Sequence, residues 1–174
     1  MAMTQHSISE LLATYRERSE AEKTGRERAN EESLQRKKQF SKTYNAIRKD
    51  LLLPAMERVT DCIEEQGHTI RYNGDKKQNK RYRMDRYKIG LKPGKETVTV
   101  AFVGNHDLNK MSVQTAYVIN GEKTNQPERL FAPDKVNENV IFESVYQALE
   151  KVIGSTGTAT QQATATKTTS ATVV

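Results

Sequence analysis

The amino-acid sequence predicts an α+β fold: a long N-terminal helical arm, a kinked central helix, an antiparallel β-meander of four or five strands, and a C-terminal helix packed on one sheet face as a two-layer sandwich. Apolar residues recur every three or four positions in residues 40–67, every second position in most of residues 68–131, and again every three or four positions near the C-terminus. The first and last spacings are typical of helices, and the middle one is typical of strands. Short turns between the strands favour an antiparallel sheet whose one face both helices cover.

Composition divides the chain of 174 residues into three parts. Residues 1–39 alternate acidic and basic side chains with few apolar ones, which predicts a solvated, partly disordered helical arm. Residues 40–154 hold the long apolar stripes and are predicted to form the α+β domain. Residues 155–174 are almost all Thr, Ala, Ser, Gly and Gln, so they bury too little apolar surface to offset chain entropy and are expected to be a disordered tail.

The central helix is predicted from residue 34 to residue 66. Pro54 has no amide hydrogen, and its ring crowds the carbonyl of Asp50, so a bend or a restart is expected near residues 50–54. Gly67 is placed to end the helix in the left-handed conformation. Cys62 falls on the apolar side of the helix and is expected to be buried. The apolar stripe comprises Phe40, Tyr44, Ile47, Leu51, Ala55, Val59 and Cys62/Ile63.

Strand signals follow the central helix. The sequence predicts a loop after Asn120-Gly121 and a C-terminal helix that begins at Asp134 or Asn137 and ends at Gly154. Its core-facing side is expected to comprise Ile141, Val145, Ala148 and Val152. The predicted strands cover residues 68–73, 81–91, 96–103, 111–119 and 129–131.

The start of the arm carries two apolar turns. They are formed by Ile8, Leu11, Leu12 and Tyr15, after which charged residues replace the apolar positions. A heptad repeat is not sustained, so a strong coiled coil is not predicted. Two interpretations remain open: a solvated arm, or an arm that self-associates or binds a partner helix through these four residues.

Positive charge is concentrated in one segment. The net charge is +6, and residues 67–96 carry ten Lys/Arg against three Asp/Glu. Such a segment with interleaved tyrosines predicts a surface for nucleic acid or another polyanion, for an acidic protein, or only a solvated edge strand whose lysines prevent edge-to-edge pairing. The candidate polyanion- or partner-binding residues are Lys76, Lys77, Lys80, Arg81, Tyr82, Arg83, Arg86 and Lys88.

No pattern in the sequence indicates catalysis. His106-Asp107 is interpreted as turn chemistry, because adjacent residues in a turn rarely form a base oriented by a carboxylate. The single cysteine excludes an internal disulfide and a cysteine-based zinc cluster. Phosphate-binding glycine loops are absent from the sequence. We therefore expect no catalytic residues, metal ligands, cofactor or small-molecule substrate.

The function predicted from these patterns is that of a non-enzymatic protein–protein interaction module, an adaptor or chaperone-like subunit of a larger assembly. It would dock through the helical arm and through the exposed sheet face or edge. The alternative is a nucleic-acid-binding accessory protein that uses the basic strand and loop Lys76–Lys88. No run approaches the roughly 18 apolar residues of a spanning helix, and no secretory signal is recognisable, so a cytoplasmic location without membrane contact is expected.

Overall fold

The computed structural model describes residues 5–74 and 82–165, with side chains described for residues 6–74 and 83–155. Contacts divide the chain into two compact units, Met1–Gln39 and Phe40–Val174. Each unit is considered by itself. Within residues 5–74 and 82–165, no helix combines the length and the apolar character needed to cross a bilayer.

The first unit is helical, as the sequence predicts. Helix α1 runs from Gln5 to Ile47, and every side chain of residues 6–36 is exposed. Ion pairs one turn apart, such as Arg36 with Glu32 at 3.2 Å, follow the charge pattern of the arm. With no buried face in residues 6–36, this part of α1 depends on such local pairs and on helix propensity rather than on packing.

The predicted interruption before Pro54 is confirmed. A π-helical segment, η1 (Arg48–Leu52), separates α1 from α2 (Leu53–Glu65). The amide of Leu53 donates to the carbonyl of Arg48, five residues back, instead of four. Because Pro54 cannot donate to the carbonyl of Asp50, the wider turn lets the helix pass the proline.

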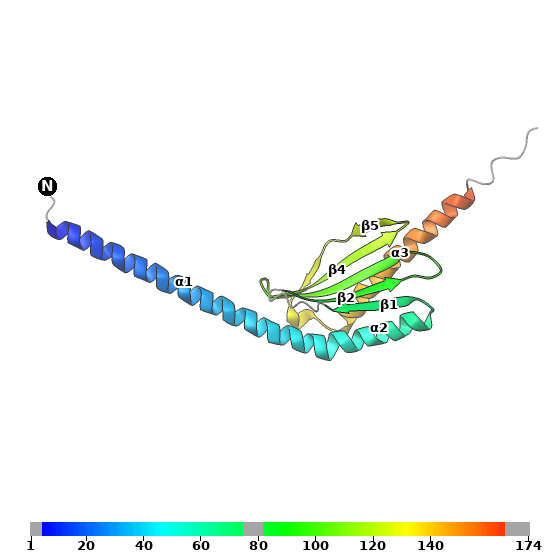
Figure 1. Ribbon diagram of the computed structural model, residues 1–174, viewed down its shortest axis with the longest axis horizontal. Coiled ribbons are helices and arrows are strands. Elements are labelled where there is room, and N and C mark those ends of the chain that lie inside the picture. Colours follow the sequence, from blue (N-terminus) through cyan, green and yellow to red (C-terminus); the bar gives the residue numbers. More distant parts are fainter. Residues whose placement is uncertain (1–4, 75–81, 166–174) are drawn as a thin grey trace, which may run out of the picture. The chain divides into compact units, whose positions relative to one another are not determined.

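The second unit contains an antiparallel sheet in the predicted meander order (Figure 1). Strands β1 to β5 are hydrogen-bonded in sequence order, and β6 also pairs with β4, beside the residues that pair with β5. The strands are β1 (Thr69–Gly74), β2 (Tyr82–Gly90), β3 (Thr97–Asn105), β4 (Lys110–Ile119), β5 (Glu122–Asn125) and β6 (Arg129–Phe131).

Strand β5 corrects the loop that the sequence predicts after Asn120-Gly121. Both residues have positive φ, 53° and 84°, so they form a two-residue turn that joins β4 directly to β5. The sequence of β5, Glu122–Asn125, has no apolar alternation, and all four side chains are exposed. The turn residues alone would have predicted this hairpin.

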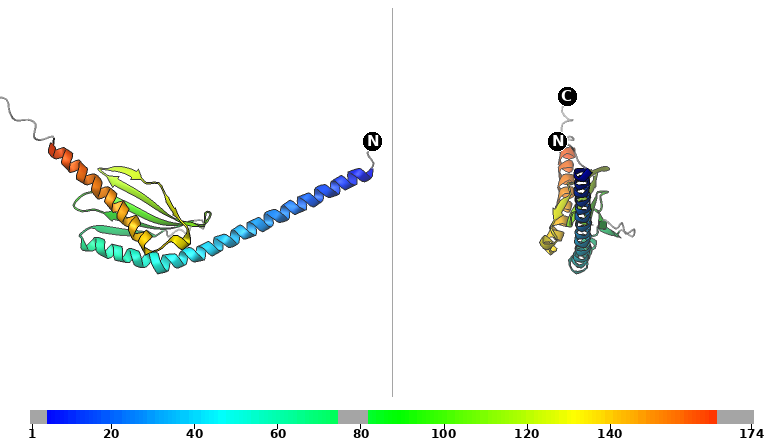
Figure 2. Two further views of the ribbon diagram at one scale, coloured as in Figure 1. Left: turned by 180° about the vertical axis from the view of Figure 1, so that it is seen from behind. Right: turned by 90° about the vertical axis from the view of Figure 1, so that its left-hand side faces the viewer.

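The helices cover one face of the sheet. Seen from the side opposite to Figure 1, α3 (Glu138–Ala165, orange) crosses in front of the sheet (Figure 2). Helix α3 contacts β3, β4 and α2, and α2 contacts β1. A short 3₁₀ turn, η2 (Pro133–Lys135), precedes α3. The predicted two-layer α+β architecture is therefore confirmed.

The core lies between the two layers and matches the predicted apolar phases. Cys62 is exposed, which corrects the prediction that it is buried, because α2 turns Val59 and Ile63 toward the core instead. Helix α3 continues past Gly154 to Ala165, so the predicted helix end at Gly154 is wrong. Of the expected tail, residues 166–174 lie outside the described residues. The core includes Tyr44, Val98, Val100, Phe102, Ile141, Val145 and Val152.

Gly104 in β3 lets the ring of Tyr44 pack directly against the strand backbone. A Cβ atom at Gly104 would lie 2.8 Å from the ring of Tyr44, which is 1% exposed. Neither the ring nor the strand backbone has room to move away. Gly90 differs, because a Cβ there would meet only the hydroxyl of Thr69, an exposed side chain, at 2.7 Å.

Gly104→Ala is expected to lower the free energy of unfolding by about 1–3 kcal/mol, because overpacking displaces Tyr44 or β3. Gly90→Ala is the matched control and is expected to cost less, since the Thr69 side chain can rotate. Chemical denaturation of both variants tests this difference. Equal losses in the two variants would contradict the packing argument.

Candidate functional site

The sheet face opposite the helices presents rows of polar and basic side chains. Alternation places Arg71 and Asn73 of β1, and Arg86 and Lys88 of β2, on this open face. In the register, Arg71 lies directly opposite Lys88, and Asn73 lies opposite Arg86. All four residues are exposed. The first row continues across the sheet through Lys88, Thr99, Ala116 and Asn125.

A hollow of about 920 Å³ lies over this open face. Small residues of the central strands, such as Thr99, Ala101 and Ala116, form its floor. Among the described residues that line it, four are basic and one is acidic, Glu128, which accepts a hydrogen bond from Gln114 at 3.1 Å. The basic residues are Arg71, Arg86, Lys88 and Lys123.

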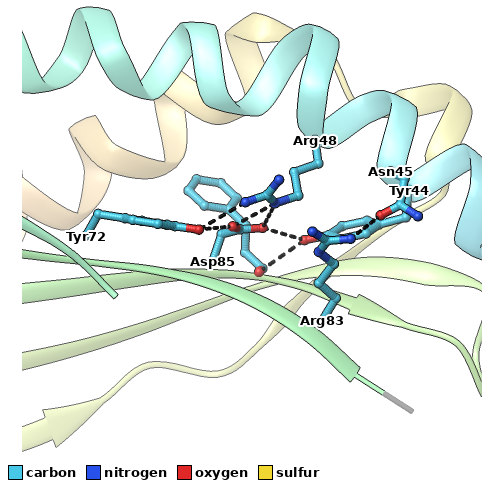
Figure 3. A network of polar contacts seen from close by, with 7 residues as sticks. Tyr44, Asn45, Arg48, Tyr72, Arg83 and Asp85 are labelled. Carbon is cyan, nitrogen blue, oxygen red and sulfur yellow. Dashed lines mark hydrogen bonds and ion pairs between the residues drawn. The ribbon is translucent and has the colours of Figure 1, made fainter. Parts of the chain in front are cut away.

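The structure separates the basic residues that the sequence groups together. Arg86 and Lys88 lie on the open face, whereas Arg83 lies on the helix side and donates to the side-chain carbonyl of Asn45 (Figure 3). Arg71 and Lys123 join the open face from other strands and were not predicted. Outside the described residues lie Lys76, Lys77, Lys80, Arg81 and the side chain of Tyr82.

The edge-strand interpretation is wrong for Arg83, Arg86 and Lys88 of β2. Strand β2 pairs with β1 on one side and with β3 on the other, so it is an internal strand. Lys88 and Arg86 therefore do not protect an open edge. The polyanion and acidic-protein interpretations remain predictions.

A buried carboxylate, Asp85, lies on the helix side of β2 (Figure 3). The Nε of Arg48 donates to both carboxylate oxygens, at 2.8 and 2.9 Å, and the hydroxyl of Tyr72 donates at 2.7 Å. The hydroxyl of Tyr44 lies 3.4 Å from the carboxylate and 3.3 Å from the carbonyl oxygen of Phe102. Asp85 is 1% exposed, so this network supplies the polar partners that water would otherwise provide.

Burial and the negative charge of Asp85 raise the pKa values of the surrounding tyrosines. Burial, with the negative charge of Asp85 as the next cause, raises the pKa of Tyr44 and of Tyr87. The pKa of Tyr72 is raised by burial and by its hydrogen bond to Asp85. Tyr44 and Tyr72 are neutral near pH 7, which is the form in which a phenol donates to a carboxylate, and the raised pKa extends that form to higher pH.

The sequence contains a signal for the burial of Asp85. Tyr87 and Ile89 are buried, and Asp85 shares their phase in β2. A carboxylate in the core phase of a strand requires a cationic or donor partner. That partner, Arg48, is 37 residues away in sequence, and nothing local identifies it.

The apolar residues predicted at the start of the arm lie on one face of α1. Ile8, Leu11, Leu12 and Tyr15 occupy positions i, i+3, i+4 and i+7 of the helix. Their exposed fractions are 53, 71, 62 and 72%. The structure therefore presents them as one apolar stripe of two turns, which no described residue covers.

His106 and Asp107 lie in the turn between β3 and β4. The ring of His106 lies edge-on to Phe40 at 5.4 Å, and the amide of Asp107 bonds to the side chain of Asn105, as in a turn. Within the described chain, no three His, Cys, Asp or Glu side chains are grouped closely enough to hold a metal ion. Comparison with protein-family models, curated proteins and solved structures found no significant match.

Asp85→Asn is expected to lower the free energy of unfolding by about 3 kcal/mol, because it leaves the largely buried charge of Arg48 without its counter-charge. Glu138→Gln is the control, since it breaks an ion pair with Arg58 whose side chains are 43% and 55% exposed. That change is expected to cost less than about 1 kcal/mol. Urea denaturation at pH 7 compares them, and equally small losses would contradict a structural role for Asp85.

The raised pKa of Tyr44 predicts a stability that falls in alkali. The unfolded phenol ionises near its ordinary pKa of 10.0, whereas the folded one resists ionisation. The free energy of unfolding is therefore unaffected by Tyr44 below pH 10 and decreases as the pH rises above it, by at most about 1.4 kcal/mol per pH unit. Tyr44→Phe should reduce this slope, with a remainder from Tyr72, Tyr87 and Tyr117, whose pKa values are also raised. Denaturation curves between pH 8 and pH 11 measure it; a slope unchanged by Tyr44→Phe would refute the prediction.

Proposed function

We propose that this chain is a non-enzymatic protein-interaction module that binds a protein partner through the start of α1. The supporting observation is the exposed stripe of Ile8, Leu11, Leu12 and Tyr15 at i, i+3, i+4 and i+7. This spacing is the one by which an amphipathic helix lays its apolar face into a hydrophobic groove. The partner's surface is therefore an apolar groove about two helical turns long.

The size of the stripe is sufficient for specific binding. Complete burial of a Leu or Ile side chain contributes about 1.5–3 kcal/mol. Single exposed apolar residues are normal on a protein surface, whereas four adjacent ones form a contiguous apolar patch. The stripe is also isolated, because residues 16–33 of α1 include no large apolar side chain. Binding at this surface is thus expected to depend on residues 8–15 and to be indifferent to the charges that follow.

The double variant Leu11→Gln, Leu12→Gln tests the proposal. Glutamine keeps helix propensity, so the change removes apolar surface without breaking α1. Affinity capture with the full chain should recover a partner that the variant loses, and the purified partner should then bind the variant at least about a hundredfold more weakly. Circular dichroism checks that helicity is retained.

Glu17→Gln with Arg18→Gln is the matched control. It makes two changes on the same helix outside the stripe, with no change in net charge, and should leave the affinity unaltered. Light scattering distinguishes a different partner from a second copy of this chain. A doubled mass that depends on Leu11 and Leu12 would replace the proposal by self-association, and identical binding by both variants would refute it.

A further inference from the structure

We infer that the open sheet face binds single-stranded nucleic acid, with phosphates held by Arg71, Arg86 and Lys88. This activity goes beyond the protein-binding function proposed for α1, and it uses different residues. Its site is the hollow of about 920 Å³ over β1–β5.

Two positive charges on the open face, those of Arg71 and Lys88, repel each other. Arg71 and Lys88 are direct cross-strand partners on the same face, where side chains are about 5 Å apart at Cβ and like charges destabilise. Arg86 lies two residues from Lys88, about 7 Å along the strand. None of the ion pairs among the described residues includes these three side chains. A bound phosphate would convert the repulsion between Arg71 and Lys88 into two attractions.

The residues on the floor and on the far side of the hollow also suit a nucleic acid. Thr99, Ala101 and Ala116 are small, so a ligand can approach the sheet backbone closely. Amide side chains of Gln114 and Asn125 line the same hollow. Asn125 offers donors and an acceptor, whereas Gln114 donates one hydrogen bond to Glu128 and keeps its carbonyl oxygen as an acceptor. The phosphates of a strand would bind the basic side chains, and the edges of its bases would hydrogen-bond to these amides on the other side of the hollow.

The shape of the site favours an unpaired strand over a duplex. A hollow of 920 Å³ is comparable to a small-ligand pocket, so it admits a few splayed nucleotides. In a duplex, the bases are stacked and paired, so their edges could not turn into the hollow toward Gln114 and Asn125. An acidic peptide would also match the charges of Arg71, Arg86 and Lys88, so a polyglutamate peptide is one arm of the test.

The test is fluorescence anisotropy of the full chain with a labelled single-stranded oligonucleotide of about 10 nucleotides. Titrations between about 50 and 200 mM salt give the slope of log K against log salt concentration. Arg71→Gln with Lys88→Gln should reduce the magnitude of this slope by about 1.4, which is about 0.7 for each lost phosphate contact. The same variant relieves the like-charge pair, so its thermal unfolding midpoint should not fall.

Arg26→Gln with Arg28→Gln is the matched control, because it removes the same charge from exposed positions of α1. It should leave the slope unchanged. An equal fall in slope for this control would assign binding to net charge and overturn the site. Absence of binding at 50 mM salt, equal affinity for a duplex of the same length, or equal affinity for a polyglutamate peptide would each overturn the inference.

Discussion

The pairing of Arg48 with Asp85 is the interaction on which the rest of the domain depends. Asp85 lies in the core phase of β2, so folding buries a carboxylate between the sheet and the helices. An unpaired buried charge is too costly to tolerate, and the guanidinium must therefore reach it. Arg48 is the first residue of η1, so the pair positions the π-helical segment over β2. The hydroxyls of Tyr44 and Tyr72 then connect the end of α1 and strand β1 to the same carboxylate.

The alternation of β2 also explains why the two faces of the sheet differ in charge. Its inner phase holds Asp85, Tyr87 and Ile89, and its outer phase holds Arg86 and Lys88. The carboxylate that could neutralise the outer residues is thus committed to Arg48 on the other face. As a result, β2 has one charged residue, Asp85, paired in the interior, and two basic residues, Arg86 and Lys88, on the open face.

Periodicity was sufficient to predict the elements that bury side chains. Strands β3 and β4 and the core side of α3 are confirmed, because burial selects apolar residues at every second or every third and fourth position. Strand β5 was missed because an exposed strand has no such selection. The edge interpretation of β2 failed for another reason: it conflicted with the predicted meander order, which places this strand between residues 68–73 and 96–103, and both neighbours pair with it. The sequence indicates that Asp85 requires a hydrogen-bond donor and that Arg48 can supply one. Only the fold brings the two residues together.

The two proposed surfaces use different physics, and this difference makes them separable in one protein. Apolar burial of the α1 stripe is hardly weakened by moderate salt, since it depends on area removed from water. Phosphate binding on the open face falls steeply with salt, because it is driven by counterion release. A partner that engaged both surfaces would therefore show two regimes: a salt-dependent part that follows Arg71 and Lys88, and a residual part that follows Leu11 and Leu12. A partner bound by one surface alone would show only one of these dependences.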